Sequence, residues 1–228
     1  MAIFSPDAAK LATKTYSQNN EDGILTSIFS QLEPRRKFFV EFGVGPPWES
    51  PLERSGMEAN CRLLREQGWD CLFMDGNSYP HKYEVKQNFI TAENINSLLS
   101  KYDVPSDFSL ISIDVDGQDI WIWEALEYRP QVVVIEYNPN IKLTSSNAMP
   151  KLEHHRWDGT QWYGAGLRAL QNLGRRKGYV LLYTTYGNAF FVLSDCVDNP
   201  EDFKIENIYK YREIHKPDRM NRAWVEVM

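Results

Sequence analysis

Three aspartates, Asp114, Asp116 and Asp119, lie between an apolar run at 110–113 and a tryptophan-rich run that follows them. Carboxylates at such a spacing can belong to a calcium loop, to a catalytic metal site or to a helix cap. An EF-hand loop is excluded because its sixth position lacks glycine, and because a strand and a helix flank it rather than two helices. A metal site and a helix cap remain as alternatives.

The two later aspartates have a structural interpretation. A helix is expected to begin near Gln118, where Asp116 is well placed as a cap and Asp119 interacts favourably with the positive end of the helix. We therefore favour a structural role for both acids.

Asp114 differs because it ends the apolar strand predicted for 108–114. The next predicted strand, 131–137, carries Glu136 near its end, and Asn138 follows. Neighbouring strands lie about 4.8 Å apart, so side chains from both ends can converge on one ion. We expect Asp114, Glu136 and Asn138 to gather Mg²⁺ or Mn²⁺, or to position an acceptor hydroxyl directly.

Apolar, β-branched and aromatic runs alternate with amphipathic stretches along most of the chain. Asn19 or Asn20 is expected to cap the second helix, and Gly68 to end the third. This alternation predicts a parallel sheet with helices on both faces. The predicted strands are 38–42, 71–75, 84–90, 108–114 and 131–137, and the predicted helices are 6–14, 19–32, 55–67, 93–102, 119–128 and 163–177.

Segment 178–195 reads as two strands joined by a turn at Tyr186, Gly187 and Asn188. The predicted fold is therefore a doubly wound, Rossmann-like α/β sheet, mostly parallel, with an antiparallel C-terminal hairpin at its edge. The length predicts one domain over 1–228. Within it we expect N-terminal helices at 1–35, an acceptor-side insertion at 138–160, and a polar tail at 200–228 that packs loosely or contacts a partner.

The composition limits the classes of partner that are expected. A net charge of −6 gives no basic footprint for bulk nucleic acid. Cys61, Cys71 and Cys196 are an odd number at unrelated spacings, which favours reduced thiols over a disulfide framework or a zinc site. No apolar run is long enough to cross a membrane, and no export signal is recognised. We expect a cytoplasmic protein without a membrane partner, as a monomer or a homo-oligomer.

Ligands of open parallel sheets bind beyond the carboxyl ends of the strands. The first predicted strand is followed by Gly43 and Gly45, which allow a ligand to approach the backbone, but Pro46 and Pro47 follow where a dinucleotide fingerprint continues toward a third glycine. The second strand ends at Asp75, and an acid here accepts hydrogen bonds from both hydroxyls of a ribose. These features favour an adenosine cofactor without phosphates, S-adenosylmethionine. A tight turn and a capping Asp75 are the structural alternative.

Eight segments, taken in order, resemble the FkbM-like S-adenosylmethionine-dependent methyltransferases of the class I superfamily. The resemblance implies a seven-stranded sheet whose last strand is antiparallel. The segments are "YSQNNEDGILTSIF", "FFVEFGVG", "GWDCLFMDGN", "NFITAENINSLL", "LISIDVDGQDIWIWEAL", "VVVIEYN", "WYGAGLRAL" and "KGYVLLYTTYGNAFFV", within residues 16–194.

The same resemblance implies positions for the cofactor. Its methionine end would lie against Glu41, Gly43 and Gly45 with help from Gln18, its ribose against Asp75, and its adenine near Ile90 and Thr91. Asp114 would lie in the same crevice.

The insertion contains further candidates. His154 or His155 can act as a general base near neutral pH, with a surface-loop histidine as the alternative. Trp157, Trp162 and Tyr163 are interpreted as packing residues in preference to a sugar platform.

The sequence thus predicts an S-adenosylmethionine-dependent O-methyltransferase acting on a hydroxyl of a small molecule or a glycan precursor, with a divalent metal as an optional aid. The alternatives are a nicotinamide-dependent oxidoreductase, which the absent third glycine disfavours, and a non-catalytic scaffold that retains this fold.

Overall fold

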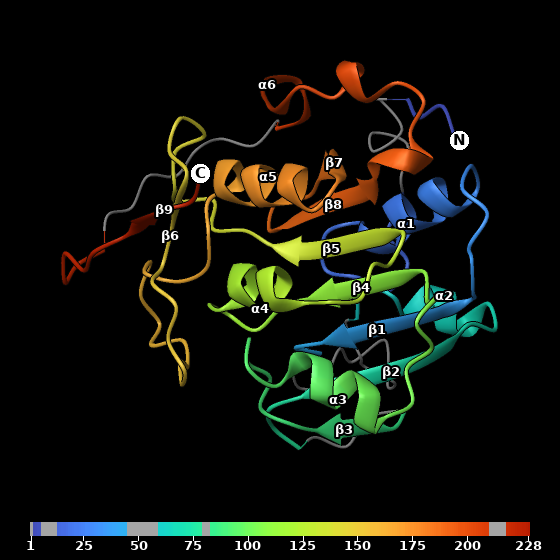
Figure 1. Ribbon diagram of the computed structural model, residues 1–228, viewed down its shortest axis with the longest axis horizontal. Coiled ribbons are helices and arrows are strands. Elements are labelled where there is room, and N and C mark those ends of the chain that lie inside the picture. The colour runs from blue at the N-terminus through green and yellow to red at the C-terminus, as the bar shows by residue number, and fades with distance from the viewer. Residues whose placement is uncertain (1, 6–12, 45–58, 79–82, 210–217) are drawn as a thin grey trace.

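The computed structural model of the protein describes residues 2–5, 13–44, 59–78, 83–209 and 218–228. Its centre is a seven-stranded sheet with the order β3-β2-β1-β4-β5-β8-β7 (Figure 1). The strands are β1 (Phe38–Phe42), β2 (Asp70–Asp75), β3 (Val85–Gln87), β4 (Leu110–Ile113), β5 (Val132–Glu136), β7 (Tyr179–Thr184) and β8 (Asn188–Leu193).

The first five strands are parallel, and β8 runs antiparallel to both β5 and β7. This confirms the predicted α/β sheet with an antiparallel hairpin at one edge. The reversed strand β8 lies inside the sheet, and β7 forms the edge itself.

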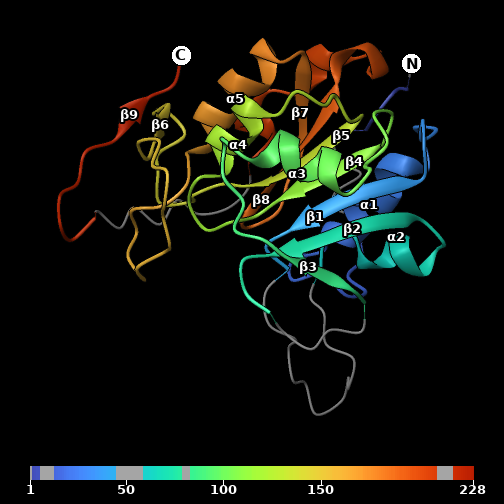
Figure 2. The same cartoon turned by 60° about the horizontal axis from the view of Figure 1, so that its bottom comes forward.

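Helices cover both faces of the sheet, as Figures 1 and 2 show. One face packs on α3, α4 and α5, and the other on α1 and α2. Along β1 the side chains alternate, so Val40 and Phe42 join the first core and Phe39 the second. The helices are α1 (Glu21–Phe29), α2 (Arg62–Glu66), α3 (Ile95–Lys101), α4 (Asp119–Ala125), α5 (Leu167–Arg176) and the short α6 (Ile205–Ile208).

The start of α1 corrects one predicted cap. Asn20 is the N-cap residue, but it has a left-handed backbone (φ 71°), and no side-chain cap hydrogen bond forms there among the described residues. Acids of the first turn act instead: Glu21 accepts the backbone N–H of Asn19, and Asp22 accepts those of 15, 16 and 17. The chain before α1 is therefore folded around Asp22.

Most predicted helices and strands exist with shorter bounds. The predicted helix 6–14 lies largely outside the described residues, and so does the beginning of the predicted helix 55–67. Gly68 follows α2 with a positive φ of 88°, as its predicted role as a helix stop requires.

The C-terminal tail does not pack loosely where it is described. Its strand β9 (Val225–Glu226) pairs antiparallel with β6 (Asn147–Ala148), which lies in the insertion (Figure 1). Val227 is buried, and its N–H donates to the carbonyl of Ser146. The tail and the insertion thus form one small second sheet.

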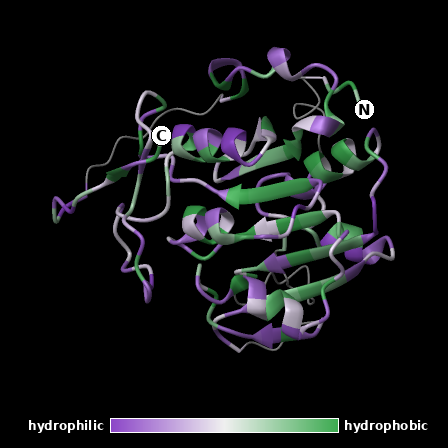
Figure 3. Ribbon diagram, in the orientation of Figure 1, coloured by the Kyte–Doolittle hydropathy of each residue, from purple (hydrophilic) through white to green (hydrophobic). Residues whose placement is uncertain are grey.

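Hydrophobic residues concentrate on the strands, whereas the outer sides of the helices are hydrophilic (Figure 3). Within the described part of the chain, no helix has the length and apolar character needed to cross a membrane.

Candidate functional site

A cavity of about 360 Å³ lies at the carboxyl ends of β1, β2 and β4. The strand order reverses between β1 and β4, which is where open α/β sheets bind their ligands. Two groups of residues line the cavity. The sheet side contributes Gly43, Asp75, Ile90, Thr91, Asp114 and Asp116, and the insertion contributes Glu153, His155, Arg156 and Trp157.

Gly43 joins β1 to this cavity. Its φ is +78°, in the left-handed region that favours glycine. A Cβ atom built there would lie 1.4 Å from the carbonyl oxygen of Asp114, so the chain after β1 is in backbone contact with the end of β4. Only glycine permits this close approach.

Asp75 and the residues after β3 form another part of the wall. Asp75 ends β2, is buried, and accepts the backbone N–H of Asn77 at 2.7 Å. Ile90 and Thr91 are buried as well and line the same cavity. The residues predicted to face a ribose and an adenine are therefore brought together.

Other predicted cofactor contacts are placed differently. The carboxylate of Glu41 accepts the backbone N–H groups of Asn60 at 2.6 Å and Cys61 at 3.0 Å, and so orders the chain before α2. Among the described residues of the cavity wall, neither Glu41 nor Gln18 occurs. Gly45 lies outside the described residues.

Three carboxylates converge beside Asp114. Oxygen atoms of Asp114, Asp119 and Glu136 all lie within 4.8 Å of one another. One oxygen of Glu136, Oε2, is buried and has no hydrogen-bond partner among the described residues. Oxygen donors of this number and kind suit a hard divalent cation.

Burial and mutual proximity raise the pKa values of the three acids. Burial raises the pKa of Asp114 and of Glu136 well above the ordinary range, and neighbouring carboxylates raise both further. Burial also raises the pKa of Asp119, to about 6, although hydrogen bonds from the N–H groups of Val115 and Gly117 oppose the shift. Such proximity is unfavourable unless protons or a cation compensate the charge.

The structure contradicts the prediction that Asn138 is a metal ligand. Its side-chain Nδ2 donates to the carbonyls of Gln161 and Tyr163, and Oδ1 accepts both the N–H and the side-chain amide of Asn140. Because both lone pairs of Oδ1 are used, the amide is committed to holding the insertion. It offers no acceptor to an ion.

Asp119 replaces Asn138 in the cluster. It also accepts the N–H groups of Val115 at 2.8 Å and Gly117 at 2.9 Å, and so orders the turn before α4. Asp119 is the first residue of α4, as predicted, but it lies in the acidic cluster as well. Asp116 does not act as the predicted cap: the N-cap of α4 is Gln118, without a side-chain cap hydrogen bond in the described structure. Asp116 is exposed at the cavity wall instead.

The structure distinguishes the two histidines. His154 is exposed and lies 3.8 Å from a carboxylate oxygen of Glu153. His155 lines the cavity, and its Nε2 is buried without a hydrogen-bond partner among the described residues. Burial lowers the pKa of His155, so its imidazole is neutral near pH 7 and can accept a proton.

The aromatic residues of the insertion also separate. Trp162 is buried, as the packing interpretation predicts, whereas Trp157 is 51% exposed and lines the cavity. Their spacing in sequence gives no signal that distinguishes these environments.

Comparison of the chain with protein-family models finds no match, and comparisons with curated proteins and with solved structures find no significant match.

Proposed function

We propose that this protein is an S-adenosylmethionine-dependent O-methyltransferase that acts on a hydroxyl of a small molecule or glycan precursor. The observation that supports this most is one cavity, at the reversal of strand order, that contains Gly43, Asp75 and the pair Ile90 and Thr91. An acid at the end of β2 suits the two hydroxyls of a ribose. Apolar Ile90 suits the face of a base.

The sequence after β1 suits a cofactor without phosphates better than a dinucleotide. Gly43 is in contact with the end of β4, and Pro46 and Pro47 follow in the sequence in place of a glycine-rich turn. S-adenosylmethionine supplies an activated methyl group when it is bound. The acceptor would then enter beside Asp114, Asp116 and His155, which line the same cavity.

The acidic cluster fits an optional Mg²⁺ or Mn²⁺ ion. Asp114, Asp119 and Glu136 would hold it, and the buried oxygen of Glu136 would gain a partner. Such an ion lowers the pKa of a coordinated hydroxyl. The role of the chain itself is to orient the acceptor hydroxyl and, through neutral His155, to accept its proton.

A cytoplasmic location is part of the proposal. It is supported by three free cysteines, of which Cys61 is buried and Cys71 and Cys196 are half-buried.

Calorimetry with S-adenosylmethionine and its demethylated product, S-adenosylhomocysteine, tests cofactor binding. We expect binding to the wild type and clear weakening in Asp75→Asn, which keeps an acceptor for the N–H of Asn77 but removes the charge that a ribose would use. The matched control is Asp70→Asn, at the exposed opposite end of β2.

Three outcomes would count against the proposal. These are no heat with either cofactor, equal weakening in the Asp75 and Asp70 variants, and preferential binding of NADH. Cofactor binding without methyl transfer to any acceptor would favour a scaffold.

A further inference from the structure

We infer that Trp157 is a fixed stacking platform for a ring-shaped, hydroxylated acceptor, with a pyranose as the class that fits best. The inference rests on the proposed function, since the platform would hold the acceptor. Trp157 is exposed over half of its surface and forms part of the cavity wall. Ligand cavities are typically lined by hydrophobic and aromatic side chains, and an indole that is half exposed in a cavity wall is available to contact a ligand.

The indole is held in place although it is exposed. Its Nε1–H donates to the carbonyl of Thr160 at 2.8 Å. Its ring packs edge to face with the ring of Tyr163, with the two ring centroids 6.3 Å apart. With the N–H already used, the indole offers a ligand its ring face only. Stacking is therefore its available interaction.

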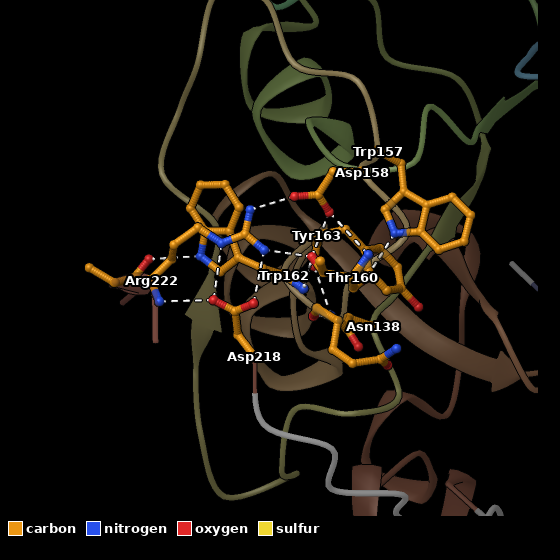
Figure 4. A network of polar contacts seen from close by, with 10 residues as sticks. Asn138, Trp157, Asp158, Thr160, Trp162, Tyr163, Asp218 and Arg222 are labelled. Atoms are coloured by element: carbon orange, nitrogen blue, oxygen red, sulfur yellow. Dashed lines mark hydrogen bonds and ion pairs between the residues drawn. The ribbon is translucent and has the colours of Figure 1, made fainter. Parts of the chain in front are cut away.

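Residues 158–160, which follow Trp157 in the chain, are held by contacts from the C-terminal tail (Figure 4). Arg222 donates to the carboxylate of Asp158 at 2.7 Å and to the hydroxyl of Thr160. Its guanidinium lies 4.3 Å from the ring centre of Trp162, and Asp218 accepts two of its N–H groups. In Figure 4, Arg222 and Asp218 lie on one side of Thr160 and the indole of Trp157 on the other.

This arrangement fixes the orientation of the indole before a ligand arrives. An ordered side chain loses little conformational entropy on binding, so the stacking energy is retained as affinity. Arg222 is accordingly a positioning residue. The ion pair persists in neutral buffer, because the hydrogen bonds from Thr160 and Arg222 lower the pKa of Asp158 to about 2.

The surroundings of the indole favour a polyhydroxylated ring. Glu153 and Asp116 line the same cavity and offer carboxylates that accept hydrogen bonds from hydroxyl groups, and Arg156 adds donors. A pyranose presents an apolar face to an indole and hydroxyls at its edge. A catechol shares the flat face but would leave most of these polar groups without partners.

Saturation-transfer NMR without cofactor tests the platform, because it detects weak binding and does not depend on methyl transfer. The probes are a panel of methyl pyranosides, catechol as the aromatic ring, and sorbitol as an acyclic polyol. We expect transfer to pyranoside ring protons, little to sorbitol, and roughly tenfold weaker binding in Trp157→Ala, with Trp157→Phe intermediate. Tyr186→Ala, an exposed aromatic residue outside the described cavity wall, is the matched control.

The role of Arg222 has its own readout. Arg222→Ala should move and broaden the indole N–H resonance of Trp157 and weaken pyranoside binding, whereas S-adenosylhomocysteine binding stays at the wild-type value. Equal transfer in wild type and Trp157→Ala would overturn the platform. If catechol binds in a Trp157-dependent way and no pyranoside binds, the pyranose class is wrong. If the wild type does not bind S-adenosylhomocysteine, that result contradicts the proposed function and not the platform.

Discussion

Two residues of the cavity wall, Gly43 and Asp114, show how the site is built from backbone as well as from side chains. Gly43 has no Cβ, so the turn after β1 can lie against the carbonyl of Asp114. Asp114 in turn directs its carboxylate to the acidic cluster while its backbone supports that turn. Both residues are therefore needed for the shape of the site before any chemistry is considered.

At this scale we predict that Gly43→Ala destabilises the protein much more than Gly68→Ala. Both glycines have positive φ, which costs alanine about 1 kcal/mol or somewhat more. Only at position 43 does the new Cβ also meet backbone, at 1.4 Å, while nothing described lies within 4 Å of position 68. Chemical denaturation of both variants measures the difference, and equal losses would contradict the backbone contact.

At the scale of elements, the site depends on the turn from β4 to α4 and on the end of β5. Asp119 opens α4 and turns its carboxylate back onto the N–H groups of Val115 and Gly117. This fold of the turn places Asp119 beside Asp114 and, across the strand pair, beside Glu136. The cluster is a product of two strand ends and one helix start.

We predict that Mn²⁺ raises the thermal midpoint of the wild type at neutral pH by several degrees. An ion that binds only the folded state stabilises it by mass action, and here it also relieves the repulsion among three acids. Asp114→Asn should lose this response. Without metal it should be at least as stable as the wild type, because at neutral pH the folded wild type must either keep a proton on Asp114 or bear its charge beside two other acids.

Asp116→Asn is the control for the metal response, because Asp116 lies in the same turn but is exposed and outside the cluster. It should keep the wild-type shift with Mn²⁺. An unchanged midpoint in the wild type, or the same shift in Asp114→Asn, would argue against a metal at this place.

The cluster also shows how far sequence could predict the site. Asp114 and Glu136 follow from the rule that strand ends meet at one edge of a parallel sheet. The sequence assigns Asp119 to a helix start, and that assignment is correct, but no spacing rule shows that a carboxylate at a helix start can also face a neighbouring strand end. The sequence predicts Asn138 in the site because it follows β5, whereas its amide donates to two backbone carbonyls that follow the insertion.

At the scale of the whole molecule, apolar runs that alternate with amphipathic stretches suffice to predict the sheet, because the strands other than the edge strand β3 bury side chains on both faces. The tail could not be predicted in this way. Its pairing with β6 involves two residues on each side, and Arg222 acts through a long-range ion pair with Asp158. Such contacts depend on the final arrangement of distant segments rather than on local patterns.

The buried acid Glu41 predicts a pH dependence of global stability. Burial raises its pKa from 4.5 to about 7. Between these values the unfolded chain releases a proton that the folded chain keeps, so the free energy of unfolding should fall by about 3 kcal/mol as the pH rises. Below pH 4.5 this contribution is fully present.

Urea denaturation of the wild type and Glu41→Gln at several pH values between 4.5 and 7 checks this dependence. The glutamine variant keeps one acceptor for the N–H groups of Asn60 and Cys61 but cannot titrate, so its stability should fall less steeply. Parallel curves for the two proteins would show that another group is responsible.

The central claim is that the cavity at the ends of β1, β2 and β4 binds a nucleoside cofactor. A crystal structure of the protein with S-adenosylhomocysteine tests it most directly. The account predicts ribose hydroxyls on the carboxylate of Asp75, the adenine beside Ile90 and Thr91, and the sulfur end toward Gly43 and Asp114. An empty cavity at saturating ligand, or the ligand bound elsewhere, would contradict it.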